Sequence, residues 1–223
     1  MALHLQTVPG DQAVEELARI RRGAASRNRQ AFLIGNPEEA ARLQETIVSP
    51  QELEETRKGI AGLKVKDWLQ ERRAELEEDG VEFDDDLVGS WAGEIEEKGG
   101  LSLHRDFNQE PLKKVLIAEA PVSRAWQIPA AVGYGGWNAC PETVVHGAMF
   151  KRWEEQYGAE ILALSSDTIE CEVSRPPHTQ EQAMALAWEQ YLFCEDIVTQ
   201  GVGSISALGG TLLNSPYWFF WWD

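Results

Sequence analysis

The chain has 223 residues, of which 43% are hydrophobic and 26% are charged. A chain of this length and composition can bury a core without disulfides or metals, and it does not fit wholesale disorder. Its 37 acidic and 20 basic residues give a formal net charge of -17, which repels nucleic acid phosphates and anionic lipid heads and attracts cationic partners. We therefore expect no direct binding to DNA or RNA, although plain solubility explains the charge equally well.

Cysteine usage and the N-terminus point to a reducing compartment. Cys140, Cys171 and Cys194 are odd in number and form no CxxC pair, which argues against a disulfide framework and a structural zinc site. The first residues lack the basic and apolar regions of an export signal, and no run approaches the roughly 20 apolar residues that span a bilayer. We expect a cytoplasmic protein that does not contact a membrane.

Helix signals dominate the first third of the chain. The pairs Asn36-Pro37 and Ser49-Pro50 each place a capping side chain before a proline at the first helical position. One short apolar run that ends in glycine predicts a buried strand among the helices. The predicted elements of this β-poor segment are a helix at 11–22, a strand at 31–35, and helices at 37–46, 50–57 and 65–78.

An acidic insertion at about 75–98 follows these helices. Eleven of the 23 residues from Glu75 to Glu97 are acidic and none is basic. Contiguous carboxylates can bind calcium, but the alternating ligands and closing glutamate of an EF-hand loop are missing. The alternatives are a solvated loop and a docking surface for a basic partner. The predicted partner-binding residues are Asp84, Asp85, Asp86, Glu94, Glu96 and Glu97; we predict no metal site and no cofactor.

The pattern becomes strand-like after Gly100. The runs LSLH, KVLIAEAP and AWQIPA are short and apolar or alternating, which predicts consecutive strands of one sheet. Apolar residues at helical spacing and a Thr-x-x-Gln capping box at Thr179 predict two covering helices. The remaining predicted elements are an irregular loop at 133–141, helices at 142–157 and 179–193, a strand pair at 159–174, and a last helical piece at 204–213.

Few residues suggest catalysis. Cys140 and His146 lie six residues apart across a loop-to-helix junction, where a helix N-terminus could lower the pKa of a thiol. Burial of Cys140 without chemistry is the other interpretation. Glu195-Asp196 is a localised pair of carboxylates that could serve as general acid and base. Glu170 and Glu172 lie two apart on a predicted strand, so alternation sends both to one face, which we expect to be exposed to solvent.

Six consecutive aromatic residues end the chain before Asp223, in the run YWFFWWD. So much apolar area is not left in water, and this segment must dock. We expect a final strand that is buried on both faces of the sheet. The alternative is an aromatic patch that binds a partner.

Several motifs of the C-terminal half occur together in one known family. They are GGWNACP at 135–141, YGAE at 157–160, RPP at 175–177, EQYLFC at 189–194 with Asp196, and WFFWWD at 218–223. In these motifs the chain resembles, from about residue 113 onward, a bacterial family known only as domain of unknown function 4253. The resemblance implies no catalytic residues, because the family has no established activity. Small acidic bacterial proteins of such families recur among immunity proteins, which neutralise toxins delivered between competing cells.

We predict an α/β or α+β protein with a mixed, mostly antiparallel sheet flanked by helices. The sheet is expected to come from residues after 100, with a helix-rich segment at 1–100 packed as one unit against the α/β domain at 101–223. The predicted function is that of a cognate inhibitor that binds a toxic bacterial effector, such as a nuclease, through its acidic surface. The alternative is an enzyme with a pocket near Cys140, His146, Glu195 and Asp196. The sequence predicts neither strand order nor oligomeric state.

Overall fold

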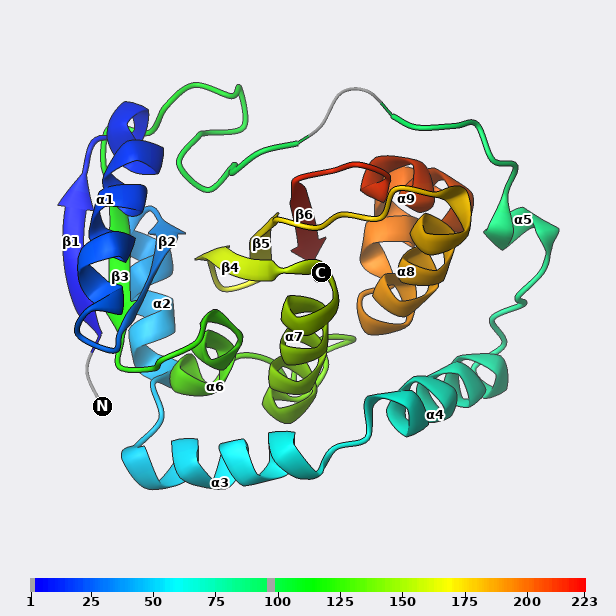
Figure 1. Ribbon diagram of the computed structural model, residues 1–223, viewed down its shortest axis with the longest axis horizontal. Coiled ribbons are helices and arrows are strands. Elements are labelled where there is room, and N and C mark those ends of the chain that lie inside the picture. The colour runs from blue at the N-terminus through cyan, green and yellow to red at the C-terminus, as the bar shows by residue number, and fades with distance from the viewer. Residues whose placement is uncertain (1–2, 96–98) are drawn as a thin grey trace.

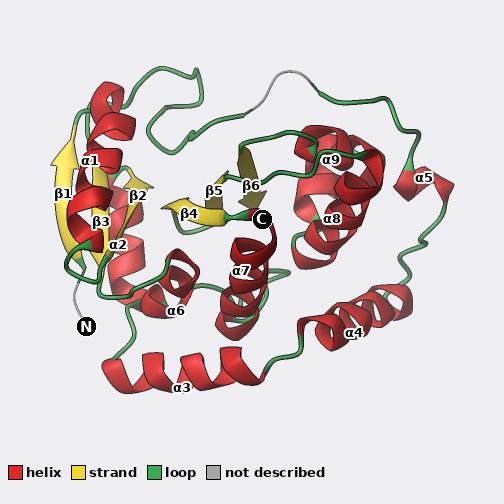
Figure 2. Cartoon of the chain, viewed as in Figure 1, coloured by secondary structure: helices red, strands yellow, loops and turns green. Residues whose placement is uncertain are grey.

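A computed structural model describes residues 3–95 and 99–223 (Figure 1). Within them, six strands form one sheet in the order β1-β3-β2-β4-β5-β6. Neighbouring strands are antiparallel except for β2 and β4, which are parallel. With helices around the sheet (Figure 2), this confirms the predicted fold class. The strands are β1 (His4–Val8), β2 (Gln30–Gly35), β3 (Val115–Ala120), β4 (Ala159–Leu164), β5 (Thr168–Val173) and β6 (Tyr217–Trp221).

The predicted helices form at the predicted places. The Asn36 side chain caps one helix by accepting from two backbone N–H groups, and Ser49 forms a capping box with Glu52 at the next. The α-helices are α1 (Ala13–Ala25), α2 (Pro37–Thr46), α3 (Pro50–Gly62), α4 (Val65–Glu78), α5 (Asp85–Val88), α6 (Ile128–Val132), α7 (Thr143–Tyr157), α8 (Gln180–Phe193) and α9 (Ile205–Leu212). Short turns of other helix types are η1 (Gly10–Gln12), η2 (Ala125–Gln127) and the π-helical turn η3 (Ile197–Val202).

The two faces of the sheet bury separate cores. On one face, Leu17 and Ile20 of α1 pack against Leu33 and Ile117 of the sheet. On the other face, a larger core joins α2, α6, α7, α8 and α9 to the strands. The chain from α3 through α5 runs around the outside of α7, α8 and α9 (Figure 1). The N-terminal helices therefore lie against the C-terminal half of the protein.

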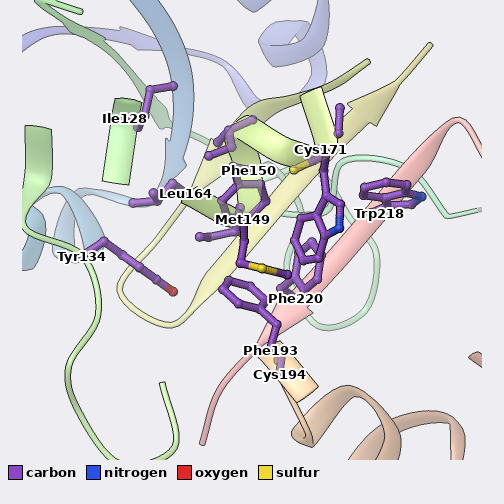
Figure 3. Packing of buried hydrophobic residues seen from close by; sticks show 14 of the residues in the cluster. Ile128, Tyr134, Met149, Phe150, Leu164, Cys171, Phe193, Cys194, Trp218 and Phe220 are labelled. Atoms are coloured by element: carbon purple, nitrogen blue, oxygen red, sulfur yellow. The ribbon is translucent and has the colours of Figure 1, made fainter. Parts of the chain in front are cut away.

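The closing aromatic run is strand β6 at one edge of the sheet. Trp218, Phe220 and Trp222 are buried, and the Phe220 ring packs against the rings of Trp153 and Phe193 at centroid distances of 5.4 and 5.5 Å. Figure 3 shows Phe220 beside Phe193 in this core. The predicted strand is confirmed. The expected burial on both faces is wrong, because the alternate residue Phe219 points to the opposite face and its relative exposure is 51%.

Two of the strands come from the first third of the chain, which corrects the expected origin of the sheet after residue 100. β1 was not predicted, since its five residues include the polar His4, Gln6 and Thr7 and it lies at an edge. β2 lies between β3 and β4 in the middle of the sheet. Its central position explains why every residue of β2 after Gln30 is apolar and buried.

Two of the strands predicted after Gly100 do not form. The LSLH run at 101–104 is an irregular segment, and the AWQIPA run at 125–130 is helical, in η2 and α6. The Gln127 side chain accepts from the backbone N–H groups of Ser123 and Arg124, and Pro129 occupies the first turn of α6. Every residue of α6 is buried, so this helix carries no polar face to distinguish it from a strand.

No helix among the described residues combines the length and the apolar character needed to cross a membrane.

The two faces of β6 predict losses of stability of different size for the same substitution. Phe220→Ala removes a side chain that is 0% exposed, and we expect it to lower the free energy of unfolding by about 3 to 5 kcal/mol. Phe219→Ala is the matched control on the half-exposed face and should cost about 1 kcal/mol or less. Urea denaturation of both variants checks this, and equal losses would contradict the assignment of the faces.

Candidate functional site

An acidic surface follows the outside of the molecule. We call residues 75–95 the acidic strap. The segment contains no lysine or arginine. It comprises the last turn of α4, the short helix α5 and the irregular chain around α5, and beyond α4 it passes along the outside of α8 and α9 (Figure 1). The exposed acidic residues of the strap are Glu75, Glu77, Glu78, Asp79, Glu82, Asp84, Asp85, Asp86 and Glu94.

Local hydrogen bonds organise the aspartate triplet. Asp84 is the N-cap of α5, and its Oδ1 atom accepts from the backbone N–H groups of Asp86 and Leu87, both at 3.1 Å. The carboxylates of Asp85 and Asp86 lie in the first turn of this helix and are exposed. The triplet therefore combines one aspartate that holds the turn with two that face solvent.

An aromatic contact anchors the strap to α8. The Phe83 ring lies 5.8 Å from the Trp188 ring and 6.3 Å from the Tyr191 ring, centroid to centroid. The Arg73 guanidinium lies 4.3 Å from the Phe83 ring centroid and 5.7 Å from that of Trp188. Phe83 therefore holds the acidic segment against α8.

Further contacts hold the strap to α9. The Ser206 hydroxyl donates to the carbonyl oxygen of Gly89, and the N–H of Ile95 donates to the carbonyl oxygen of Gly210, each at 3.0 Å. Trp91 packs against Gly209, where an added Cβ would lie 2.9 Å from the indole ring. A larger residue than glycine at this point of α9 would displace Trp91.

The structure describes four of the six predicted partner-binding residues, and their surroundings differ. Asp84 is largely committed to capping, and Asp85 and Asp86 face solvent. A carboxylate oxygen of Glu94 accepts from the Asn214 side chain at 2.8 Å. Glu96 and Glu97 lie outside the described residues.

The structure brings Cys140 and His146 together. The Cys140 Sγ atom lies 3.3 Å from the His146 Nε2 atom, in a buried position below the 133–141 loop. The Gly135 and Gly136 backbones adopt positive φ angles of 103° and 82° in this loop. A Cβ at Gly135 would lie 2.1 Å from the carbonyl oxygen of Pro141, so only glycine allows the loop to fold this tightly over the pair.

Burial keeps both groups neutral. It raises the pKa of the Cys140 thiol far above its ordinary value, with smaller contributions from the neighbouring Cys194 and Glu142. Burial also lowers the pKa of His146 to about 3, against a smaller opposing effect of the Pro141 carbonyl. The reactive thiolate–imidazolium pair is disfavoured in this environment.

Aromatic rings enclose the pair. The His146 ring lies 5.0 Å from the rings of Tyr134 and Phe193 and 5.2 Å from that of Trp222, centroid to centroid. Tyr134 and Phe193 are both among the buried residues that Figure 3 shows in the core. The surroundings are thus those of an aromatic core.

The other two residues of the predicted enzyme pocket have different partners. Glu195 lies 3.9 Å from the Arg72 guanidinium. The Asp196 carboxylate accepts from the Gln200 side chain at 2.8 Å and from the backbone N–H of Asp223 at 3.1 Å. Within the described part of the chain, neither carboxylate forms a hydrogen bond with Cys140 or His146.

Glu170 corrects another expectation. It shares a sheet face with Glu172, as alternation predicts. However, Glu170 is only 2% exposed, whereas we expected this face to be exposed to solvent. The segment after Gly100 folds over it, and the carboxylate accepts from the backbone N–H of Ser102 at 2.8 Å and from the Ser102 hydroxyl. Burial raises the pKa of Glu170, against these hydrogen bonds. A strand pattern cannot indicate that a distant loop covers one of two equivalent positions.

Sequence reasoning also missed a cavity at the β6 edge of the sheet. It is lined by Gln190, Asp196 and Trp218, among other residues. Gln190 lies in the EQYLFC motif and Trp218 in the WFFWWD motif. The sequence showed both motifs, but only the structure shows that they line one cavity.

Comparison with known proteins identifies the C-terminal part of the chain. Residues 116–223 match the family described as Domain of unknown function (DUF4253). The match confirms the resemblance for this part of the chain and begins within β3, so DUF4253 as matched includes neither β1 nor β2. No curated protein and no solved structure matches the chain.

The burial of the cysteines predicts low thiol reactivity. Burial raises the pKa of Cys140, Cys171 and Cys194, the last to about 12. We expect almost no reaction with a disulfide reagent near neutral pH in the native protein and rapid reaction of all three thiols in guanidinium chloride. A spectrophotometric thiol assay measures both rates. Fast modification of Cys140 in the folded protein would contradict the buried, neutral pair.

His146 predicts a specific loss of stability in acid. Because its pKa falls from 6.5 to about 3 on folding, the unfolded chain binds a proton that the folded chain does not, and stability is lost as pH falls below 6.5. Between about pH 7 and about pH 5 we expect the wild type to lose about 2 kcal/mol more than His146→Gln. Urea denaturation measures this difference, and His4→Gln at an exposed position should behave as wild type. Parallel pH profiles of wild type and His146→Gln would contradict it.

Proposed function

We propose that this protein binds a cationic protein partner through the acidic strap and acts as its cognate inhibitor. The observation that carries the proposal is the strap itself, a run of exposed carboxylates held against α8 and α9 by Phe83 and Trp91. A toxic bacterial effector of the nuclease class is the partner that fits best, because a nuclease needs a cationic groove to hold phosphate. In this role the protein is an immunity protein.

Anchoring makes the strap more than a charged tail. The contacts of Phe83 with α8 and of Gly89, Trp91 and Ile95 with α9 hold the backbone in place before a partner arrives. A surface that is already ordered loses less conformational entropy on binding than a disordered segment does. The capped turn at Asp84 presents Asp85 and Asp86 in one defined geometry.

Charge supports fast recognition as well as selectivity. The net charge of -17 attracts a cationic surface over the range set by salt screening and repels nucleic acid. Electrostatic complementarity raises association rates and suppresses binding to acidic proteins. These properties suit an inhibitor that must reach its target before the target reaches nucleic acid.

An enzyme that uses Cys140, His146, Glu195 and Asp196 is the second candidate. The 3.3 Å contact between Cys140 and His146 is the observation in its favour. Such an enzyme needs an ionisable, accessible thiol, so the thiol reactivity described above separates the two candidates. Rapid native-state modification of Cys140 would favour the enzyme.

Neutralising the strap should weaken the complex. In the triple variant Glu82→Gln, Asp85→Asn and Asp86→Asn, the capping residue Asp84 is kept, and we expect the dissociation constant for the partner to rise about tenfold. The partner is sought first as the product of the neighbouring gene, by pull-down at low salt, and its affinity is measured by titration calorimetry. Raising the salt from about 0.05 M to about 0.5 M should weaken the wild-type complex more than the variant complex.

The control removes the same number of charges elsewhere. The variant Asp11→Asn, Glu15→Gln and Glu45→Gln changes exposed residues of η1, α1 and α2, away from the strap. It should bind the partner within about twofold of wild type. If both triple variants bind equally well, or if no partner is recovered at low salt, the proposed function fails.

A further inference from the structure

A cavity of about 290 Å³ lies between β6, α8, α9 and η3, and neither Cys140 nor His146 is among its lining residues. Its wall is mostly apolar, and two of its hydrophobic members, Val202 and Phe219, are 40% and 51% exposed. These two side chains therefore mark the mouth. The apolar lining includes Ile197, Val202, Leu208, Leu212, Tyr217 and Phe219.

Two hydrogen-bond donors in the wall have no partner among the described residues. They are the Gln190 Nε2 atom, in a residue that is 1% exposed, and the Trp218 Nε1 atom, in a residue that is 2% exposed. Figure 3 shows the indole nitrogen of Trp218 directed away from the core cluster of Phe150 and Phe193. Buried donors are nearly always paired, so two in one cavity wall point to an acceptor that binds there.

Three other polar side chains of the wall, those of Thr211, Ser215 and Asp196, already have partners. The Thr211 hydroxyl donates to the carbonyl oxygen of Leu208 at 2.7 Å, and the Ser215 hydroxyl donates to that of Tyr217 at 2.8 Å. Both carboxylate oxygens of Asp196 accept hydrogen bonds within the protein, from Gln200 and Asp223. The two N–H donors are thus the groups of the wall that a ligand would satisfy.

We propose that this cavity binds an uncharged, largely apolar small molecule that carries a carbonyl oxygen, which accepts from the Gln190 and Trp218 donors. The apolar walls select against a strongly hydrated ligand. Asp196 in the wall and the net charge of -17 disfavour an anion. A cation is disfavoured because the groups that need a partner are donors. An uncharged acceptor satisfies all three conditions.

This cavity is independent of the acidic strap as a binding surface. Its mouth residues Val202 and Phe219 belong to η3 and β6, whereas the aspartate triplet belongs to α5. The small-molecule site is therefore an activity beyond the proposed inhibitor function, and each can be tested while the other is intact.

The test is a fluorescence titration of the purified full-length chain with Prodan, an uncharged naphthyl ketone dye whose emission depends on its surroundings. We expect saturable binding with a blue shift of the emission. Anilinonaphthalene sulfonate, an anionic dye with the same fused ring system, should bind more weakly. In nitrogen-labelled protein, the indole N–H resonance of Trp218, identified by its loss in Trp218→Phe, should move downfield when Prodan binds.

Three variants locate the site. Val202→Trp places a large side chain at the exposed mouth and should raise the Prodan dissociation constant at least about tenfold. Gln190→Leu and Trp218→Phe each remove one donor and should raise it about threefold to tenfold. Val14→Trp is the matched control, the same change at an exposed position of α1 that does not line this cavity, and should leave it unchanged. Circular dichroism and the melting temperature check that each variant is folded.

Binding that weakens in Val202→Trp but not in Val14→Trp, with the shift of the Trp218 resonance, supports the proposal. Val202 is a surface residue, so this comparison holds even if a buried variant does not fold. Absence of saturable binding overturns the proposal, as does equal affinity in Val202→Trp and wild type. Tighter binding of the sulfonate dye than of Prodan overturns the assignment of an uncharged ligand.

Discussion

The burial of one face of β6 against α7 and α8 is the contact on which the rest of the structure depends. Trp218, Phe220 and Trp222 alternate with outward residues, and their rings pack with Trp153 and Phe193 in edge-to-face and stacked geometries. Aromatic side chains bury more apolar area than any others, and such pairs add directional attraction to that burial. This packing joins the end of the chain to α7 and fixes where α8 lies against the edge of the sheet. Everything that docks on α8 and α9 follows from it.

The acidic strap and the cavity are two consequences of the same packing. The strap rests on the outer side of α8 and α9 through Phe83, Trp91 and backbone hydrogen bonds. The cavity lies where the same helices meet the edge of β6. Because α8 is held in place, the strap is anchored on a fixed support, and Gln190 stays buried in the wall of the same cavity as Trp218. One helix pair thus supports both the charged outer surface and the apolar cavity for which we propose binding.

The matched DUF4253 region does not form the sheet alone. It begins at residue 116, yet β2 lies between β3 and β4 and pairs with both. Without β2, the backbone groups of β3 and β4 that pair with β2 would lose their hydrogen-bond partners in the core. The N-terminal segment also supplies β1, α1 and the strap. Sheet and binding surface therefore require both halves of the chain.

Local patterns in the sequence determined most helices, the strand pair of β4 and β5, the aromatic strand β6 and the acidic segment with its Phe83 anchor. These features depend on capping residues such as Asn36 and Ser49 and on periodicity, which act over a few residues. Only the tertiary structure decided that Glu170 is buried while Glu172 is exposed, that the apolar run of α6 is helical, that β2 is central, and that Gln190 meets Trp218. Each of these depends on which distant segment covers a given face. The free energy of that contact comes from burial between parts of the chain that are far apart in sequence. A local pattern does not indicate which distant segment will cover it.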